Sequence, residues 1–290
     1  MKHDERTAQY RNAIEQSLSG WLAMYGKEPQ KLLYDAMEYS LLGGGKRLRP
    51  IFTLEFCRLC CGDWKKAEAF ATAIEMIQTY SLIHDDLPAM DNDDFRRGKP
   101  TNHKVYGEGI AILAGDALLT DAFACAASAD IPGEDVAFAI SVLAENAGSA
   151  GMVGGQVLDI MSESRVLNEQ EVLDIQNRKT GALINAACAL GVIAGGGSQE
   201  QLQAACGFAR CLGLAFQIRD DMLDVIGTQE EMGKGVGTDA AKNTFVRLYG
   251  LEKCEELVQK YTDAAIDQLS AFEDTDYLIT LARSLTDRKV

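Results

Sequence analysis

Residues 65–84 read KKAEAFATAIEMIQTYSLIH, and this stretch decides the fold class. Its small or apolar residues recur at spacings of three and four positions, as at Ala67, Ala71, Ile74, Ile77 and Ser81. That spacing places them on one face of an α-helix, whereas a half-buried strand would need every second position. The composition agrees, because Ala, Glu, Gln and Met are strong helix formers. We therefore predict a helix that packs its apolar face against a protein core.

The same helical spacing extends over most of the chain. It covers residues 5–24, 30–42, 51–61, 109–128, 134–150, 169–194, 199–225, 246–270 and 275–286. The alternating pattern of a strand is nearly absent, and only five prolines occur in 290 residues. None of the breaks between helices is a long linker rich in Pro, Ser or Gly. We predict an all-α protein with one domain spanning residues 1–290.

The chain is acidic, with 43 Asp and Glu residues against 28 Lys and Arg and a formal net charge of −15. Such a surface repels nucleic-acid phosphates and anionic lipid headgroups. The first residues, MKHDER, are too polar for a signal peptide, and no run of about 18 apolar residues indicates a membrane span. We therefore expect a cytoplasmic protein with no membrane span and no nucleic-acid partner. An anionic substrate would need a local basic cluster or metal ions.

An acidic cluster, Asp85-Asp86-Leu-Pro-Ala-Met-Asp91, directly follows the apolar helix at 65–84. Pro88 disfavours helical angles in the residue before it, so the helix should stop there. We expect Asp91 to return toward the other two carboxylates on a loop.

A second acidic cluster, Asp220-Asp221-Met-Leu-Asp224, follows another apolar run. Spacings of three and four residues put its three carboxylates on one helix face. Carboxylates this close repel one another, and Mg²⁺ relieves the repulsion because it prefers oxygen ligands, typically one or two carboxylates with waters and substrate phosphates. A solvated helix end is the simpler interpretation of one such cluster. Two clusters with a DDxxD-like spacing, each on an apolar helix, favour metal sites that face a diphosphate.

Basic and polar residues lie where a diphosphate would need them. In the run Gly43-Gly44-Gly45-Lys46-Arg47-Leu48-Arg49, flexible glycine backbone precedes Lys and Arg, the usual phosphate partners. A second basic pair follows the first acidic cluster directly. That pair is Arg96 and Arg97, and the further candidate donors are Lys179, Thr180, Gln217, Lys234 and Lys242.

In their order along the chain, these motifs resemble the polyprenyl (isoprenyl) diphosphate synthase family. The matching segments are GGGKRLRP at 43–50, SLIHDDLPAMDNDDFRRGKPTNH at 81–103, GGQVLD at 154–159, KTG at 179–181 and FQIRDDMLD at 216–224. Within the family the chain is most similar to bacterial farnesyl diphosphate synthases (geranyltranstransferases), which carry the same insertion, here Pro88-Ala89, in the first Asp motif.

The resemblance implies a fold, a partner, a cofactor and a set of site residues. It implies a single-domain helical bundle around a deep central cavity, a homodimer, and about three Mg²⁺ ions per active site. The implied metal ligands are Asp85, Asp86, Asp91, Asp220, Asp221 and Asp224, and the implied catalytic residues are the first five of these with Lys179. The allylic diphosphate would be bound by Arg96, Lys179, Thr180, Gln217, Lys234 and Lys242. Isopentenyl diphosphate would be bound by Lys46, Arg49, Gln78 and Arg97.

The implied activity is Mg²⁺-dependent condensation of isopentenyl diphosphate with dimethylallyl or geranyl diphosphate by ionisation, condensation and elimination. In the family, the residues four and five positions before the first Asp, here Ser81 and Tyr80, form the floor of the cavity. An aromatic residue at the fifth position goes with a C15 product. We therefore expect farnesyl diphosphate.

Three alternatives remain beside this expectation. A geranylgeranyl diphosphate synthase would differ only in making a C20 product. A class I terpene cyclase would also use an Asp-rich motif with Mg²⁺, but its second motif usually carries Asn, Ser and Glu, and it would not need GGGKRLRP for a second diphosphate. A catalytically silent partner subunit usually has eroded Asp motifs, whereas both are intact in this sequence.

Overall fold

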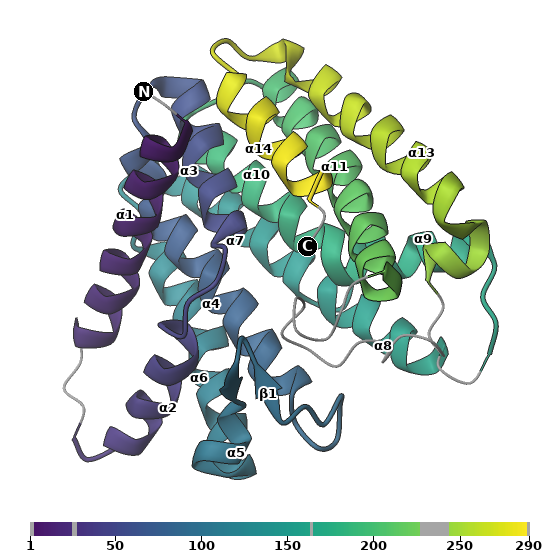
Figure 1. The fold of residues 1–290 in the computed structure, drawn as a ribbon. Helices are drawn as coiled ribbons and strands as arrows, with labels where there is room; N and C mark the ends of the chain where they lie inside the picture. Colours follow the sequence, from purple (N-terminus) through teal and green to yellow (C-terminus); the bar gives the residue numbers. More distant parts are fainter. Residues whose placement is uncertain (1–2, 25–27, 163–164, 227–243, 289–290) are drawn as a thin grey trace.

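The computed structural model describes residues 3–24, 28–162, 165–226 and 244–288. Across these residues the protein is almost entirely helical, which confirms the all-α prediction (Figure 1). The first half comprises α1 (His3–Met24), α2 (Lys31–Leu41), α3 (Leu48–Cys61), η1 (Trp64–Ala67), α4 (Glu68–Asp85), α5 (Asn102–Tyr106), α6 (Glu108–Ala127) and α7 (Gly133–Ala147). The second half comprises α8 (Met152–Ser162), α9 (Glu169–Gln176), η2 (Asn177–Gly181), α10 (Ala182–Ala194), α11 (Gln199–Ile226), α13 (Phe245–Gln268), η3 (Leu269–Ala271) and α14 (Asp276–Thr286).

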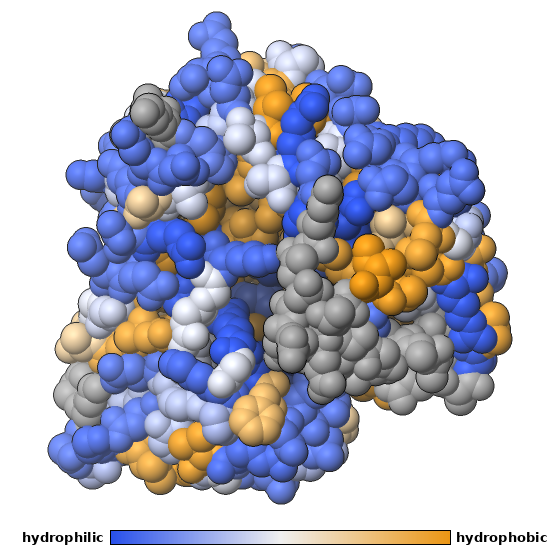
Figure 2. All heavy atoms as spheres, viewed as in Figure 1, coloured by the Kyte–Doolittle hydropathy of each residue, from blue (hydrophilic) through white to orange (hydrophobic). Residues whose placement is uncertain are grey.

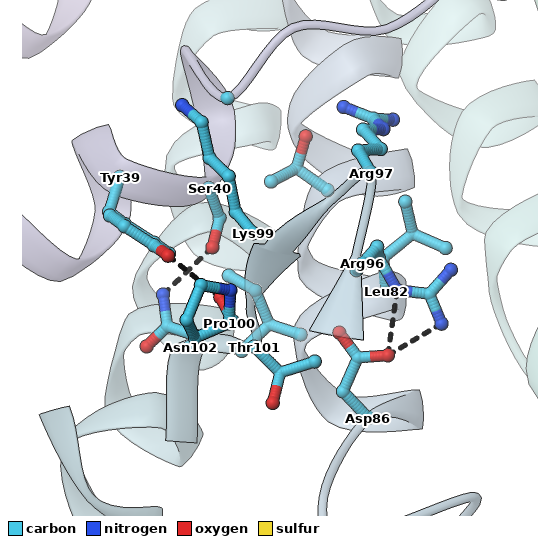
Figure 3. Close-up of a pocket in the computed structure, with 13 residues that line it drawn as sticks. Tyr39, Ser40, Leu82, Asp86, Arg96, Arg97, Lys99, Pro100, Thr101 and Asn102 are labelled. Atoms are coloured by element: carbon cyan, nitrogen blue, oxygen red, sulfur yellow. Dashed lines mark hydrogen bonds and ion pairs between the residues drawn. The ribbon is translucent and has the colours of Figure 1, made fainter. Parts of the chain in front are cut away.

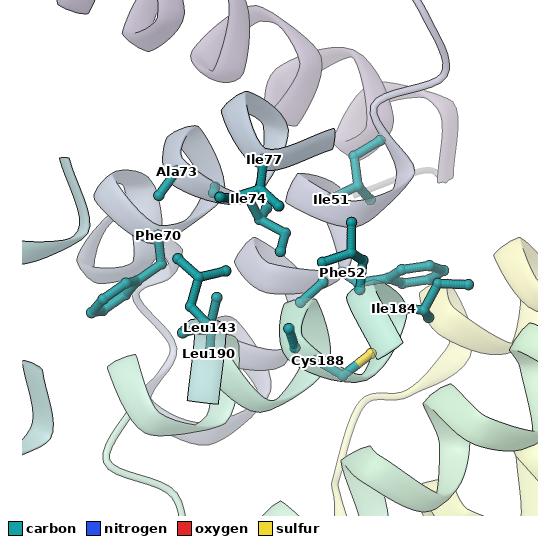
Figure 4. Packing of buried hydrophobic residues seen from close by; sticks show 14 of the residues in the cluster. Ile51, Phe52, Phe70, Ala73, Ile74, Ile77, Leu143, Ile184, Cys188 and Leu190 are labelled. Carbon is teal, nitrogen blue, oxygen red and sulfur yellow. The ribbon is translucent and has the colours of Figure 1, made fainter. Parts of the chain in front are cut away.

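Helix α10 lies at the centre of the bundle, where it packs against α3, α7 and α11 (Figure 1). Every residue of this helix is buried except Asn185, which agrees with its sequence, since a helix that is apolar on all sides is a core helix. Gly191 lets α3 approach closely, because a Cβ at that position would lie 2.3 Å from the carbonyl oxygen of Thr53. Around α10, apolar side chains of α3, α4 and α7 interlock in one large core (Figure 4).

A second, smaller apolar cluster holds the other end of α11. Leu214, Ile218 and Met222 of α11 pack with residues of α9 and with Phe245 and Val258 of α13. This cluster fixes the stretch of α11 that carries the second acidic motif. The two cores therefore place both acidic motifs at the ends of well-packed helices.

Besides the short helix α5 and the hairpin described below, the structure differs from the predicted elements at α8 and at η2. The Gly-rich segment that follows α7 forms the helix α8, which the spacing analysis did not predict because glycine has low helix propensity. The predicted helix at 169–194 contains a π-helical turn, η2, between α9 and α10. Both differences fall in segments that carry site residues.

The only strands in the described residues are two of two residues each, β1 (Phe95–Arg96) and β2 (Lys99–Pro100). They pair antiparallel, with Phe95 opposite Pro100, and form a short hairpin after the first acidic motif (Figure 1). Arg97, in the turn, adopts a left-handed backbone conformation with φ 54°. The hairpin thus turns two consecutive arginines in different directions.

Candidate active site

The first acidic motif has the backbone that Pro88 predicted. Helix α4 ends at Asp85, and the chain then folds back, so that the amide of Asp91 donates to the carbonyl of Asp85 at 2.9 Å. Asn92 takes up the left-handed conformation needed for this reversal, with φ 54°. The loop therefore returns Asp91 to the end of the helix, as expected.

Asp85 and Asp86 have different partners. The amide of Gln156, on α8, donates to Asp85 Oδ1 at 2.8 Å. Asp86 is 3% exposed and accepts from Arg96, whose Nε lies 2.7 Å from its Oδ1 (Figure 3). Burial raises the pKa of both carboxyls, Asp91 raises that of Asp85 further, and Lys179 and Arg96 act in the opposite direction. These carboxylates are thus close enough to repel and are balanced by neighbouring cations.

Lys179 and Thr180 lie on the π-helical turn η2, and π-helical turns are frequent at functional sites. Gly155 of α8 makes room for this turn, because a Cβ there would lie 2.3 Å from the backbone nitrogen of Lys179. Lys179 Nζ pairs with Asp159 of α8 at 2.6 Å. Gln156 and Asp159 are site residues that the sequence reasoning did not assign, although both lie in the GGQVLD segment that it quoted.

The second acidic motif is linked to this turn by hydrogen bonds. Thr180 Oγ1 donates to Gln217 Oε1 at 3.3 Å, and the Gln217 amide donates to Asp221 at 3.0 Å. Asp221 is 5% exposed and also accepts from the backbone amide of Phe245 at 2.8 Å. Asp224 lies one turn further along α11 and is half-buried. A chain of polar contacts therefore runs from the turn beside the first motif to the second.

A C-terminal residue, which the sequence reasoning also missed, reaches the second motif. Arg288 pairs with Asp220, and its guanidinium lies over the ring of Phe216, 4.4 Å from the ring centroid. Lys46 is nearby, since its pKa is lowered by burial and then by the charge of Arg288, while Asp220 raises it. No motif indicated this contact, because it joins a chain end to a residue 68 positions away.

The residues predicted for isopentenyl diphosphate gather at the other side of the first motif. Arg49 follows the glycine run at the start of α3, and burial lowers its pKa to about 10. Within the described residues its Nε is buried and has no hydrogen-bond partner. Arg97 donates to the carbonyl of Gly44, so the hairpin contacts the glycine run directly. Gln78 is half-buried on α4.

A pocket of about 50 Å³ opens between α2, α4 and the hairpin (Figure 3). Arg96, Arg97 and Lys99 line it beside Asp86 and Thr79. Figure 2 shows mainly hydrophilic side chains over the face of the molecule seen in Figure 1. Three cations in one small pocket make it suited to an anion despite the acidic chain.

Tyr80 and Ser81 lie on the last turns of α4. Tyr80 is 6% exposed, and its ring meets the ring of His84 edge-on, with centroids 5.7 Å apart. Ser81 is half-buried and donates to the carbonyl of Gln78 at 2.9 Å. Their role as a cavity floor stays a prediction. Lys234 and Lys242 lie outside the described residues.

The donor set fits Mg²⁺. Within the part of the chain that the structure describes, no group of three His, Cys, Asp or Glu side chains could enclose a metal ion by itself. Mg²⁺ does not need one, because it keeps several waters and binds one or two carboxylates together with substrate phosphates. At the first motif, Asp85 and Asp91 would hold the Mg²⁺ ion. The two lie close enough that the charge of Asp91 raises the pKa of Asp85. Asp220 and Asp224 would hold Mg²⁺ at the second motif.

Comparison with known proteins agrees with this geometry. A family model described as polyprenyl synthetase matches residues 30–280. The chain is 47% identical over 274 residues to heterodimeric geranylgeranyl pyrophosphate synthase large subunit 1, chloroplastic, of Arabidopsis thaliana, covering 91% of this chain and 74% of that protein. It is 46% identical over 286 residues to geranylgeranyl pyrophosphate synthase 7, chloroplastic, of the same plant, covering 96% and 82%.

A solved structure is also similar. The crystal structure of an FPP/GFPP synthase from Zymomonas mobilis superposes with a TM-score of 0.89 at 37% identity and covers 98% of each chain. Fold and family evidence therefore agree.

The expectation of a cytoplasmic protein is wrong by this comparison, because several curated relatives are named chloroplastic. The expectation used the lack of a signal peptide in the sequence. That feature separates secreted proteins from others, but it does not separate the cytoplasm from the interior of an organelle.

Proposed function

Since the chain belongs to the polyprenyl synthetase family and is a trans-prenyltransferase, we propose that it joins isopentenyl diphosphate to an allylic diphosphate with Mg²⁺ and forms geranylgeranyl diphosphate. The observation that carries the proposal is the turn that bears Lys179 and Thr180: the charge of Lys179 lowers the pKa of Asp85 against its burial, and hydrogen bonds run from Thr180 through Gln217 to Asp221. These contacts link the two acidic motifs, as the binding of a diphosphate with metal ions requires.

The first chemical step breaks the allylic C–O bond and leaves a carbocation and a diphosphate. Bound Mg²⁺ would supply Lewis acidity to the leaving diphosphate. Lys179, Thr180, Gln217 and Arg96 would orient that diphosphate and balance its charge. In the structure Lys179 and Arg96 already lie against acidic side chains of the site, so these cations are in place before a ligand binds.

The second substrate would be held beside the glycine run. Lys46, Arg49, Gln78 and Arg97 would bind the diphosphate of isopentenyl diphosphate, and its double bond would attack the carbocation. Proton loss completes the reaction, and by resemblance to the family the released diphosphate accepts that proton. The buried apolar residues of α4 would shield the carbocation from water.

Two observations support different product lengths. The curated relatives at 43–49% identity are geranylgeranyl diphosphate synthases, which supports C20. Tyr80, a buried aromatic residue five positions before Asp85, supports C15, the second candidate, and the Zymomonas relative at 37% identity is an FPP/GFPP synthase. The curated relatives carry more weight because their sequences are more similar to this chain, at 43–49% identity against 37%.

Product analysis tests both readings. Labelled isopentenyl diphosphate is incubated with Mg²⁺ and dimethylallyl, geranyl or farnesyl diphosphate, and the products are separated by chain length. A dominant C20 product supports the proposal, whereas a reaction that stops at C15 favours farnesyl diphosphate synthase. A cyclic hydrocarbon would indicate a terpene cyclase, and no condensation at all would indicate a silent partner subunit.

We also propose that the protein is a homodimer. Helices α6, α7 and α8 expose apolar side chains, namely Ile112, Leu113, Phe138, Val153, Val157 and Met161. Two segments of this region, Glu108–Ala127 and Gly133–Ser162, are long and apolar enough to cross a membrane. In the most apolar 18 residues of each segment, only 39% and 28% are buried inside the protein. A second copy packed on this surface accounts for these side chains, since large exposed apolar patches mark interaction sites. Sedimentation velocity measures the mass of the protein in solution, and a mass twice that of one chain supports the homodimer.

For the location, the chloroplastic names of several curated relatives favour a plastid. Organelle fractionation with an antibody to the protein tests this assignment.

A further inference from the structure

A buried carboxylate lies beside the predicted isopentenyl diphosphate site. Glu75, on α4, is 3% exposed and lies one turn before Gln78. A carboxylate next to a diphosphate site opposes binding by charge repulsion, and a buried charge is costly unless it is paired. The position of Glu75 therefore needs an explanation in terms of its partners.

Its partner is Arg47, which lies in the basic run but does not face the ligand. The Arg47 side chain is fully buried. Its Nη1 donates to Glu75 Oε1 at 2.5 Å, its Nε to Glu15 Oε1 at 2.8 Å, and its Nη2 to the carbonyl of Leu41 at 2.7 Å. Every guanidinium nitrogen is therefore bound by the protein. Burial would lower the pKa of Arg47, but Glu75 and Glu15 raise it overall.

The backbone at Arg47 is also unusual. It is left-handed, with φ 53° and ψ 34°, and it forms the N-cap position of α3. This conformation is unfavourable for a residue with a Cβ and persists only where the surroundings impose it. The three hydrogen bonds of the side chain supply that constraint. They fix the direction in which the chain enters α3, and hence where Lys46 and Arg49 lie on either side.

Glu75 acts on two further arginines. It raises the pKa of Arg49 and of Arg97, against the lowering by burial. Arg97 lowers that of Arg49, and Arg47 lowers that of Arg97, so the guanidinium groups repel one another. Without a shared carboxylate, these cations would be driven apart in the absence of ligand.

We propose that Glu75 is the internal counter-ion that assembles the isopentenyl diphosphate site, and that Arg47 couples it to the glycine run. Both are positioning residues, since the protein itself binds every nitrogen of the Arg47 guanidinium and Glu75 is a buried anion paired with that guanidinium. The inference rests on the proposed function for the identity of that ligand.

The proposal predicts that removing the charge of Glu75 weakens diphosphate binding, whereas charge repulsion alone predicts that it strengthens binding. Glu75→Gln removes a negative charge near an anion site, so charge alone would tighten diphosphate binding. If Glu75 holds the arginines in place, the variant binds isopentenyl diphosphate about tenfold more weakly, because misplaced groups lose their contacts to the ligand. Arg47→Lys keeps the charge but cannot bridge two carboxylates and a carbonyl. We expect it to weaken binding by a similar factor.

The experiment measures binding of isopentenyl diphosphate and of inorganic pyrophosphate by calorimetry without Mg²⁺, and KM for each substrate with Mg²⁺. The expected result is weaker binding in both variants, a raised KM for isopentenyl diphosphate and an unchanged KM for the allylic substrate. Equal or tighter binding by Glu75→Gln overturns the proposal. Because Arg47→Lys keeps both carboxylates, it also decides the matter if Glu75→Gln does not fold.

Glu55→Gln is the matched control. Glu55 is another fully buried carboxylate, on α3, and it accepts hydrogen bonds from Arg6, Arg58 and Tyr10. We expect this variant to lose stability with binding unchanged, and a tenfold loss of binding would show that general destabilisation explains the effect. If wild-type protein catalyses no condensation, the proposed function fails, and the pyrophosphate measurement still decides the role of Glu75.

Discussion

At the residue scale, cations of the protein occupy the acidic motifs. Arg96 forms an ion pair with Asp86, and Arg288 forms one with Asp220. Lys179 pairs with Asp159 and also lowers the pKa of Asp85 by its charge. Each pair relieves the repulsion that carboxylates would otherwise exert on one another. The metal ions and diphosphate of the proposed function would therefore have to displace or rearrange these contacts.

Arg288 gives a direct test of this competition. We expect Arg288→Gln to bind divalent metal several-fold more tightly, because a positive group near Asp220 is removed, and to melt at a lower temperature without metal. Binding of Mn²⁺ in the absence of substrate, followed by electron paramagnetic resonance, measures the affinity. Arg283→Gln, an exposed change on α14, should alter neither quantity. Unchanged metal affinity in Arg288→Gln would contradict the competition.

A prediction at the same scale concerns the proposed role of Tyr80 in product length. We expect Tyr80→Ala to make longer products than wild type, because it removes a buried ring from the turn before Asp85. Chromatography of products at matched turnover measures the change. Phe70→Ala, also buried on α4, should lower stability by a similar amount, about 3–5 kcal/mol, without lengthening the product. An unchanged product profile in Tyr80→Ala would remove this residue from the floor.

At the element scale, the packing of α10 on α3 supports the site, since α3 begins at the basic run. We expect Gly191→Ala to destabilise the protein by about 1–3 kcal/mol through overpacking, because its Cβ would meet the carbonyl of Thr53. Gly20→Ala in α1 is the control, since a Cβ there meets nothing within 4 Å. It should stabilise by about 0.5–1 kcal/mol. Urea denaturation measures both, and equal effects would argue against close packing at Gly191.

Helix α8 shows why some elements escaped prediction. Its segment contains Gly154 and Gly155, which lower helix propensity, yet Gly155 allows the helix to lie against the turn that carries Lys179. Tertiary packing thus overrides local propensity where the site demands close approach. The same contact brings Gln156 to Asp85, a pairing across 71 positions that spacing arguments cannot see.

At the scale of the whole molecule, ligand binding should stabilise the fold by mass action. We expect Mg²⁺ with inorganic pyrophosphate, at about 100 times the dissociation constant, to stabilise the protein by about 2.7 kcal/mol. Differential scanning fluorimetry measures the rise in melting temperature. Pyrophosphate or Mg²⁺ alone should give less, and Asp85→Asn with Asp220→Asn should abolish the combined effect. A full effect in that double variant would place the metal elsewhere.

The sequence by itself determined the fold class and indicated the chemistry that we propose. Helical spacing around residues 65–84 and over the rest of the chain implied an all-α protein, because periodicity reports which residues face the core. The two Asp motifs implied sites for a divalent metal and a diphosphate, because close carboxylates need a cation. Pro88 even determined where α4 stops and Asp91 turns back.

Only the tertiary structure decided which residues support that chemistry. Gln156 on Asp85, Arg288 on Asp220 and Glu75 on Arg47 are all contacts between distant elements. Such contacts depend on how helices pack and not on spacing along one helix. Arg47 is the clearest case: the sequence places it among phosphate-binding residues, whereas packing turns its side chain into the protein, where two carboxylates hold it.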